Sequence, residues 1–245
     1  MAVYGLIGYP LTHSFSKAYF TAKFEREGLS DCSYINCEIE SLDLLKSTIE
    51  KEKLFGFNVT IPFKSKIISY LDSINEAAER IGAVNTVIRA KNNQLKGYNT
   101  DYIGFKESIK PLLKPYHTQA LILGNGGSAK AVAYALNELN IEYRIATRNP
   151  VLSEHIHYDQ LTALDVRNAA LIINTTPLGM FPNSESFPDI PYQGIDKFHL
   201  LFDLVYNPSE SQFLKKGTAR GAQTINGYSM LVRQAEEAWK IWQGN

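Results

Sequence analysis

The sequence of 245 residues predicts an α/β protein with two domains that each contain a mainly parallel sheet, and three observations support this fold class. Apolar runs typical of buried strands alternate with helical patterns along the chain, which indicates βαβ units. These runs are too numerous for a single sheet of ordinary width. A new apolar run, QALILG, follows a helical segment near residues 101–115, where we expect one domain to end and the next to begin.

The expected elements follow each other in a regular order. The runs VYGLIG and YINCEI precede helical patterns over residues 15–28 and 42–52, and FGFNV precedes a helical stretch that extends to residue 81. The run AVNTVIRA adds a further strand to the first domain. QALILG, EYRIATR, ALIINTT, LLFDLVY and AQTING are the strand-like runs of the second domain.

The C-terminal segment carries apolar residues at helical spacing, which predicts an amphipathic helix. These residues are Leu231, Ala235, Ala238, Trp239 and Trp242. We expect this helix, over residues 228–245, to pack back on the first domain. The predicted domains are therefore residues 1–101 together with this helix, and residues 102–227.

Composition argues against several classes of partner. The 25 basic and 25 acidic residues balance, with a pI near 7.0, which does not favour binding to nucleic acid or to a membrane surface. Apolar runs are shorter than a membrane span, and MAVYGLIGYP is too short and polar for a signal peptide. Only two cysteines, Cys32 and Cys37, occur, as expected of a reduced, cytoplasmic protein.

A glycine turn opens the second domain. In ALILGNGGSAKAVAYAL, Gly124, Gly126 and Ala129 match the pattern G-x-G-x-x-[G/A] between a strand and a helix. The first glycine permits the tight turn, the second allows a pyrophosphate to approach, and the small third residue packs the helix on the strand. Such a pattern alone can be a plain strand–helix connection. Its context favours a dinucleotide site of the Rossmann type, with phosphates at the helix N-terminus.

The next strand indicates which dinucleotide binds. A site that prefers NAD usually offers Asp or Glu after this strand, whereas this sequence offers Thr147, Arg148 and Asn149. An arginine can form charge-assisted hydrogen bonds to the 2′-phosphate of NADP. The alternative is a solvated surface arginine. We therefore expect NADP, with a single arginine supplying the preference.

Polar side chains gather near the expected strand ends of the first domain. The segments GYPLTHSFS, GFNVTIPFK, GAVNT and GYNTD supply them, and the ligands of open α/β sheets bind at the carboxyl ends of strands. Each such residue alone is more often a helix cap or a turn former, so the indication comes from their convergence. The residues are Ser14, Ser16, Asn58, Thr60, Lys64, Asn85, Thr86, Asn99 and Asp101.

These motifs, with GNGGSAKA, NTTPLGM and NGYSMLVRQA, occur in the order found in shikimate dehydrogenases, and the resemblance covers nearly the whole chain. That family reduces 3-dehydroshikimate on the route to chorismate and aromatic amino acids. The resemblance implies an N-terminal substrate domain, a Rossmann-like NADP domain and a C-terminal helix that returns to the first. The chain is somewhat short for the family, which suggests trimmed loops.

The resemblance also implies roles for individual residues. Lys64 and Asp101 match the catalytic pair, and Ser14 and Ser16 match the residues that hold the substrate carboxylate. Thr60, Asn85 and Gln234 would contact substrate hydroxyls, with Tyr206 as a further substrate contact. The residues matched to cofactor binding are Gly124, Asn125, Gly126, Gly127, Ser128, Ala129, Thr147, Arg148, Asn149, Leu204 and Gly227.

The residue types suit this chemistry. When hydride reaches a ketone, charge develops on oxygen, which a lysine ammonium can stabilise and protonate. We expect Lys64 to be charged and Asp101 to orient it, with no metal, and we interpret His155 and His157 as a polar surface turn. Two alternatives remain: a quinate/shikimate dehydrogenase that uses NAD, and a cofactor-binding protein without turnover. A monomer or a homodimer is expected.

Overall fold

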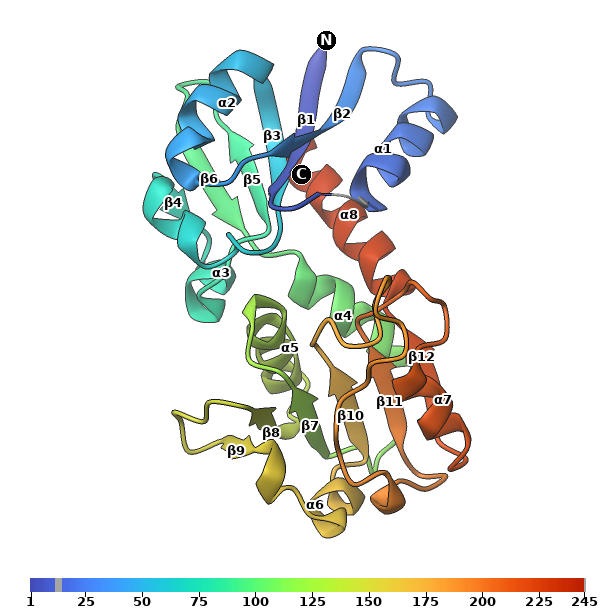
Figure 1. Cartoon of the computed structure of the whole chain (residues 1–245). Helices are drawn as coiled ribbons and strands as arrows, with labels where there is room; N and C mark the ends of the chain where they lie inside the picture. Colours follow the sequence, from blue (N-terminus) through green and yellow to red (C-terminus); the bar gives the residue numbers. More distant parts are fainter. Residues whose placement is uncertain (12–14, 245) are drawn as a thin grey trace. The chain divides into compact units, whose positions relative to one another are not determined.

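The computed structural model describes residues 1–11 and 15–244 of the chain (Figure 1). The backbone divides into two compact units, here called the first unit (residues 1–101 and 234–245) and the second unit (residues 102–233). Within the described residues, each unit contains one six-stranded sheet with helices. The predicted α/β class with two sheets is confirmed.

The sheet of the first unit has the strand order β2-β1-β3-β5-β6-β4. Strands β1, β2 and β3 are parallel to one another, whereas β5 runs antiparallel to both β3 and β6. Short β4 pairs with β6 in parallel. The strands are β1 (Ala2–Gly8), β2 (Cys32–Glu38), β3 (Leu54–Val59), β4 (Ser73–Ile74), β5 (Thr86–Arg89) and β6 (Leu95–Tyr98).

The antiparallel hairpin corrects one expectation. Asn85 and Thr86 were expected at the carboxyl end of a strand, but they lie at the amino end of β5. Because β5 runs opposite to β3 and β6, its amino end lies at the edge of the sheet where those two strands finish. The polar residues therefore still meet at one edge.

The helices of the first unit are short, and α3 is capped at both ends. They are α1 (Phe15–Arg26), α2 (Leu45–Glu52), α3 (Glu76–Ile81) and the 3₁₀ turns η1 (Leu42–Leu44) and η2 (Lys66–Tyr70). Asn75 caps α3 by accepting from the Ala78 N–H, and Gly82 ends the helix at φ 66°. The helical stretch expected up to residue 81 is thus interrupted, because η2 and β4 precede α3.

Helices cover both faces of this sheet. Strand β1 alternates between two apolar clusters, with Ile7 packed toward α2 and Tyr4 packed toward α1 and the C-terminal helix α8 (Tyr228–Gln243). Residues 234–243 of α8 belong to the first unit, so the predicted return of the C-terminal helix is confirmed for this segment. Residues 228–233 group with the second unit.

Trp242 is the centre of that packing. Its ring stacks on Tyr4 with centroids 4.7 Å apart, and its Nε1 donates to the Val87 carbonyl oxygen at 3.0 Å. A Cβ atom at Gly56 would lie 2.5 Å from the indole, so the glycine leaves room for the ring to lie directly on β3.

The sheet of the second unit is entirely parallel, in the order β12-β11-β10-β7-β8-β9. In chain order this is 3-2-1-4-5-6, the arrangement of dinucleotide-binding sheets, with its switch point between β7 and β10. The strands are β7 (Gln119–Leu123), β8 (Glu142–Thr147), β9 (His155–His157), β10 (Leu171–Asn174), β11 (Leu200–Asp203) and β12 (Gln223–Asn226).

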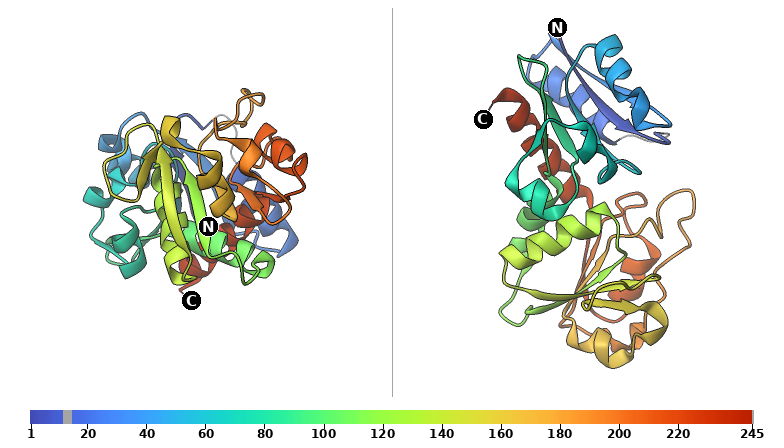
Figure 2. Two further views of the ribbon diagram at one scale, coloured as in Figure 1. Left: turned by 90° about the horizontal axis from the view of Figure 1, so that it is seen from below. Right: turned by 90° about the vertical axis from the view of Figure 1, so that its left-hand side faces the viewer.

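Helices also lie on both faces of this second sheet (Figure 2). One apolar cluster joins the sheet to α4 and α5, and another joins it to α6 and α7. These helices are α4 (Asp101–Ile109), α5 (Gly127–Glu138), α6 (Ala163–Asn168) and α7 (Gln212–Thr218). No helix in the described part of the chain is both long and apolar enough to cross a membrane.

The histidine pair was interpreted wrongly. His155 and His157 form strand β9 rather than a surface turn, and His155 is buried with its Nδ1 accepting from the Val151 N–H. Among the described residues, no cluster of three or more His, Cys, Asp or Glu side chains could hold a metal ion.

Candidate active site

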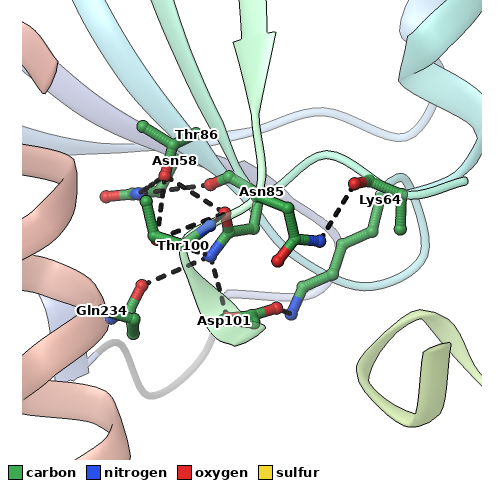
Figure 3. Close-up of polar contacts among 9 residues, drawn as sticks. Asn58, Lys64, Asn85, Thr86, Thr100, Asp101 and Gln234 are labelled. Atoms are coloured by element: carbon green, nitrogen blue, oxygen red, sulfur yellow. Dashed lines mark hydrogen bonds and ion pairs between the residues drawn. The ribbon is translucent and has the colours of Figure 1, made fainter. Parts of the chain in front are cut away.

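A buried hydrogen-bond network occupies the edge of the first sheet where β3 and β6 end and β5 begins (Figure 3). Asn85 lies at its centre, and its Nδ2 donates to Asp101 Oδ1 at 2.8 Å and to Thr100 Oγ1 at 3.0 Å. Its Oδ1 accepts from the Thr100 N–H at 2.7 Å. Gln234 of α8 accepts a longer bond from the same Nδ2, at 3.4 Å.

Lys64 and Asp101 form an ion pair within this network. Lys64 Nζ lies 2.7 Å from Asp101 Oδ2, and the two side chains are only 16% and 8% exposed. Lys64 follows the turn after β3, where the Val84 N–H donates to its carbonyl oxygen at 2.7 Å. Asp101 is the first residue of α4, where the helix dipole favours a carboxylate.

The carboxylate of Asp101 is held from both sides. Lys64 contacts Oδ2 while the amide of Asn85 donates to Oδ1, so each oxygen has a fixed partner. The lysine ammonium is thereby oriented by a side chain that is itself anchored in the sheet. Such a pair can present a positive charge and a proton to a ligand at the sheet edge.

Two predicted residues extend this arrangement, and one lies outside the described residues. Thr60 is half-buried directly after β3, and Ser16 lies in the first turn of α1. The Ser16 side chain lies near the hydroxyl of Tyr34, and this hydroxyl donates to Asn58 Oδ1 at 2.8 Å. Ser14, predicted as a partner of Ser16, is outside the described part.

Several network residues carried no predicted role. Asn58 donates to Thr86 Oγ1 at 3.1 Å and to the Asn85 carbonyl oxygen at 3.2 Å, and thereby ties β3 to β5. Thr100 precedes Asp101 in the motif GYNTD, and Tyr34 is buried within β2. Burial raises the pKa of Tyr34, so its hydroxyl keeps its proton and remains a donor.

The glycine turn of the second unit has the expected geometry. Gly124 follows β7 at φ 101°, and a Cβ there would lie 2.9 Å from Thr176 Cγ2 and 3.0 Å from Thr175 Oγ1. Gly126 caps α5, and a Cβ on it would meet nothing within 4 Å. Of these two positions, the protein itself requires glycine at residue 124, whereas close approach of a ligand would explain the glycine at residue 126.

Other predicted cofactor residues lie at neighbouring strand ends. Arg148 directly follows β8, is exposed, and forms no ion pair with any described residue. Thr147 is buried, and its Oγ1 accepts from the Asn149 N–H at 3.3 Å. Leu204 and Gly227 follow β11 and β12 and touch each other, since a Cβ on Gly227 would lie 2.2 Å from the Leu204 carbonyl oxygen.

A buried carboxylate fixes the segment after β11. Asp203 accepts from Asn174 Nδ2 at 2.9 Å, from the Val205 N–H at 3.0 Å, and from the Ser211 hydroxyl. Burial raises the pKa of Asp203 to about 6, although these donors act in the opposite direction. The predicted substrate residue Tyr206 lies in this segment, in the second unit.

Comparison with known proteins agrees with this geometry. A family model described as the shikimate dehydrogenase substrate binding domain matches residues 6–87. A shikimate dehydrogenase (NADP(+)) from Methanococcus maripaludis (strain C6) is 40% identical over 256 residues, which cover 98% of this chain and 91% of the relative. The chain belongs to the shikimate dehydrogenase family.

Solved structures of shikimate dehydrogenases have the same fold. The enzyme from Peptoclostridium difficile is 36% identical with a TM-score of 0.87, covering all of this chain and 92% of the other. The enzyme from Thermus thermophilus, solved with NADP(H) and shikimate, is 31% identical with a TM-score of 0.88, covering all of this chain and 94% of the other. The two-domain fold expected from the motifs is therefore that of the family.

The variant Ser16→Ala distinguishes a substrate-binding role of Ser16 from a purely structural role. If Ser16 holds a substrate carboxylate, Ser16→Ala should raise KM by about 10- to 150-fold with a smaller change in kcat, because a hydrogen bond to a charged group is lost. Steady-state kinetics measure this split. A lower melting temperature with unchanged KM would instead assign Ser16 to the stability of α1.

Proposed function

We propose that this protein is an NADP-dependent shikimate dehydrogenase, an oxidoreductase that reversibly reduces 3-dehydroshikimate to shikimate in chorismate biosynthesis. The observation that carries the proposal is the ion pair between Lys64 and Asp101 at 2.7 Å, set in the amide network at the sheet edge. Membership of the family, and a relative solved with NADP(H) and shikimate, support the same reaction.

Lys64 and Asp101 are assigned the proton chemistry. NADPH supplies the hydride for the C3 ketone. Lys64 stabilises the negative charge that develops on the ketone oxygen and donates a proton from Nζ, and in the reverse direction it accepts that proton. Asp101 keeps Nζ oriented and accepts a hydrogen bond from the adjacent substrate hydroxyl.

The remaining substrate contacts are assigned by the motifs that this chain shares with the family. Asn85 and Gln234 supply amide groups and Thr60 a hydroxyl for the ring hydroxyls. Ser14 and Ser16 are assigned to the carboxylate, and Tyr206 is a further substrate contact. The first unit is thus the substrate domain and the second unit the cofactor domain.

The second unit suits NADP. Amides at the N-terminus of α5 face the position expected for the pyrophosphate, and Gly126 leaves open space there. Residues 143–149 contain no carboxylate that would repel a 2′-phosphate, and Arg148 within this segment is exposed. The assigned cofactor residues are Gly124, Asn125, Gly126, Gly127, Ser128, Ala129, Thr147, Arg148, Asn149, Leu204 and Gly227.

The decisive experiment follows reduced nicotinamide by absorbance with four combinations of substrate and cofactor. Shikimate with NADP should give the highest kcat/KM. Quinate with NAD as the better pair would favour the broader quinate/shikimate dehydrogenase. A protein that binds the cofactor but turns over neither substrate would be the non-catalytic alternative. Cytoplasmic localisation and a monomer or homodimer remain predictions.

Arg148→Ala should weaken NADP binding while changing NAD binding little, because only NADP carries a 2′-phosphate to pair with the guanidinium. Loss of that charge-assisted contact should raise the Kd for NADP by about 10-fold or more. Titration of both cofactors measures the change, and the second cofactor reports any general folding defect.

Arg167→Ala is the matched control for removal of the Arg148 charge. Arg167 is also exposed in the second unit, but it lies near the end of α6, before β10 begins, and therefore far from the carboxyl edge of the sheet. This variant should bind both cofactors normally. Equal weakening of NADP and NAD by Arg148→Ala would remove the arginine from cofactor selection.

A further inference from the structure

Two helices that carry proposed substrate residues pack against each other in the first unit. Helix α1 carries Ser16, and the end of α8 that belongs to this unit carries Gln234 (Figure 1). Their apolar contact is the cluster that contains Phe20, Ala235 and Trp242. The position of one helix on the other therefore sets the distance between two proposed substrate contacts.

A cluster of polar side chains also joins these two helices. Lys23 Nζ of α1 contacts both carboxylate oxygens of Glu236 in α8, at 2.9 and 3.0 Å, and Glu27 Oε1 at 2.8 Å. The Tyr19 hydroxyl donates to the same Glu236 carboxylate. Burial, with that carboxylate beside it, raises the pKa of Tyr19, so the hydroxyl keeps its proton and stays a donor. Two successive turns of α1 thus hold one side chain of α8.

Stability alone does not explain this cluster. The Lys23 side chain is only 4% exposed, and taking an ammonium out of water costs free energy that its partners offset only in part. An apolar residue of similar volume is often as stabilising at such a site, or more so. The ion pair adds a fixed geometry, because Nζ must lie within reach of the Glu236 and Glu27 carboxylates at once.

The place of Glu236 in α8 links this geometry to the site. Glu236 and Gln234 are two residues apart, so their side chains leave the helix about 200° apart, the first toward α1 and the second toward Asn85. Because a helix turns as a rigid rod, fixing the direction of Glu236 also fixes that of Gln234. Trp242 anchors α8 as well, but it lies eight residues, roughly two turns, beyond Gln234.

Ser16 depends on the same cluster through α1. Tyr19 and Lys23 follow Ser16 by three and seven residues, so all three lie on one face of the helix. The contacts of Tyr19 and Lys23 with α8 therefore hold the helix face that carries Ser16.

Resting on the proposed function, we propose that Glu236 is a positioning residue for shikimate. Held by Tyr19 and Lys23, it fixes the rotation of α8 that turns Gln234 toward the substrate. The same contacts hold Ser16 in place for the substrate carboxylate. Glu236 acts through these two residues rather than by touching the substrate.

Replacing the ion pair by apolar residues tests this role. The double variant Lys23→Met, Glu236→Leu should keep a melting temperature close to that of the wild type, because an apolar pair of similar size replaces the ion pair. Its Kd for shikimate, measured by calorimetric titration, should nevertheless rise by about 3- to 10-fold, since hydrogen bonds to the substrate lose their alignment. Its Kd for NADP should not change.

Glu236→Gln is a milder second variant. The amide keeps the length of the side chain and an acceptor for Tyr19, but it removes the charge that Lys23 contacts. We expect a smaller rise in the Kd for shikimate, and in steady-state kinetics a higher KM with a smaller change in kcat.

Two controls separate charge and packing from positioning. Glu237→Gln changes the neighbouring carboxylate of α8, whose ion pair with Lys240 at 3.0 Å lies within the helix, and this variant should bind shikimate normally. Phe24→Leu loosens the apolar contact between the helices, because Phe24 is 5% exposed and packs on Trp239 with ring centroids 5.2 Å apart. Its melting temperature should fall while its Kd for shikimate stays unchanged.

Two results would overturn the assignment. An unchanged Kd for shikimate in both Glu236 variants would leave the cluster with a role in folding alone. An equal rise in Phe24→Leu would assign the effect to the general packing of α1 on α8. Failure of the proposed function appears separately, as a wild-type protein that neither binds shikimate nor turns it over with NADP.

Discussion

Lys64→Ala is expected to lower kcat by about 100- to 10,000-fold, the usual loss when one positioned proton donor is removed. Nζ of Lys64 lies 2.7 Å from Asp101 in a half-buried setting, and alanine leaves the developing oxyanion without this cation. Shikimate binding should remain measurable, because the other polar groups of the edge persist. Steady-state kinetics and a binding titration measure the two effects.

Two companion variants sharpen this prediction. Lys66→Ala removes an exposed lysine two residues away, in η2, and should leave kcat unchanged. Asp101→Asn should be nearly as severe as Lys64→Ala, because an amide still bonds a hydroxyl but cannot pair with the ammonium. Near wild-type turnover of Lys64→Ala would exclude this lysine from the mechanism.

Trp242→Ala is expected to lower the free energy of unfolding by about 3–5 kcal/mol, as is typical when a large core side chain is truncated. The indole is 2% exposed, stacks on Tyr4, and lies 5.3 Å from Phe20 between ring centroids. Its removal leaves a cavity over Gly56 and frees the Val87 carbonyl oxygen. Urea unfolding followed by circular dichroism measures the loss.

Trp242→Phe and Trp239→Ala give the comparison for this effect. Phenylalanine keeps much of the ring volume but not the Nε1 donor, so it should cost less than alanine. Trp239 is half-buried and packs at the margin of the same cluster, so its truncation should also be milder. A loss below about 1 kcal/mol for Trp242→Ala would contradict the central role of this side chain.

The sequence predicted the elements that depend on local patterns. The alternation of strands and helices, the glycine turn at Gly124 and the amphipathic C-terminal helix each follow from short-range signals. The direction of β5 does not, because an apolar run such as AVNTVIRA is the same whether its partners run parallel or antiparallel. Pairing direction depends on contacts between distant segments, and so the hairpin was missed.

The site residues also divide into those that short motifs predict and those whose role depends on contacts between distant segments. Lys64, Asn85, Asp101 and Gln234 were identified from motifs, and the structure brings these four together. The support from Asn58 and Thr100 depends on hydrogen bonds between β3, β5 and the start of α4, which no sequence spacing specifies.

The β5–β6 hairpin runs between two ends of the first sheet that have different roles. The polar network with Asn85 lies at one end, and an exposed turn lies at the other. This turn, residues 90–94, is exposed and closed by the Ala90 N–H donating to the Gln94 carbonyl oxygen at 2.8 Å. Strand β5 lies between Asn85 and this turn, so five residue steps set Ala90 roughly 16 Å from Asn85. Exposed turns of this kind tolerate inserted residues. A fluorophore or an affinity tag placed there gives a reporter of the first unit that leaves the lysine–aspartate pair untouched.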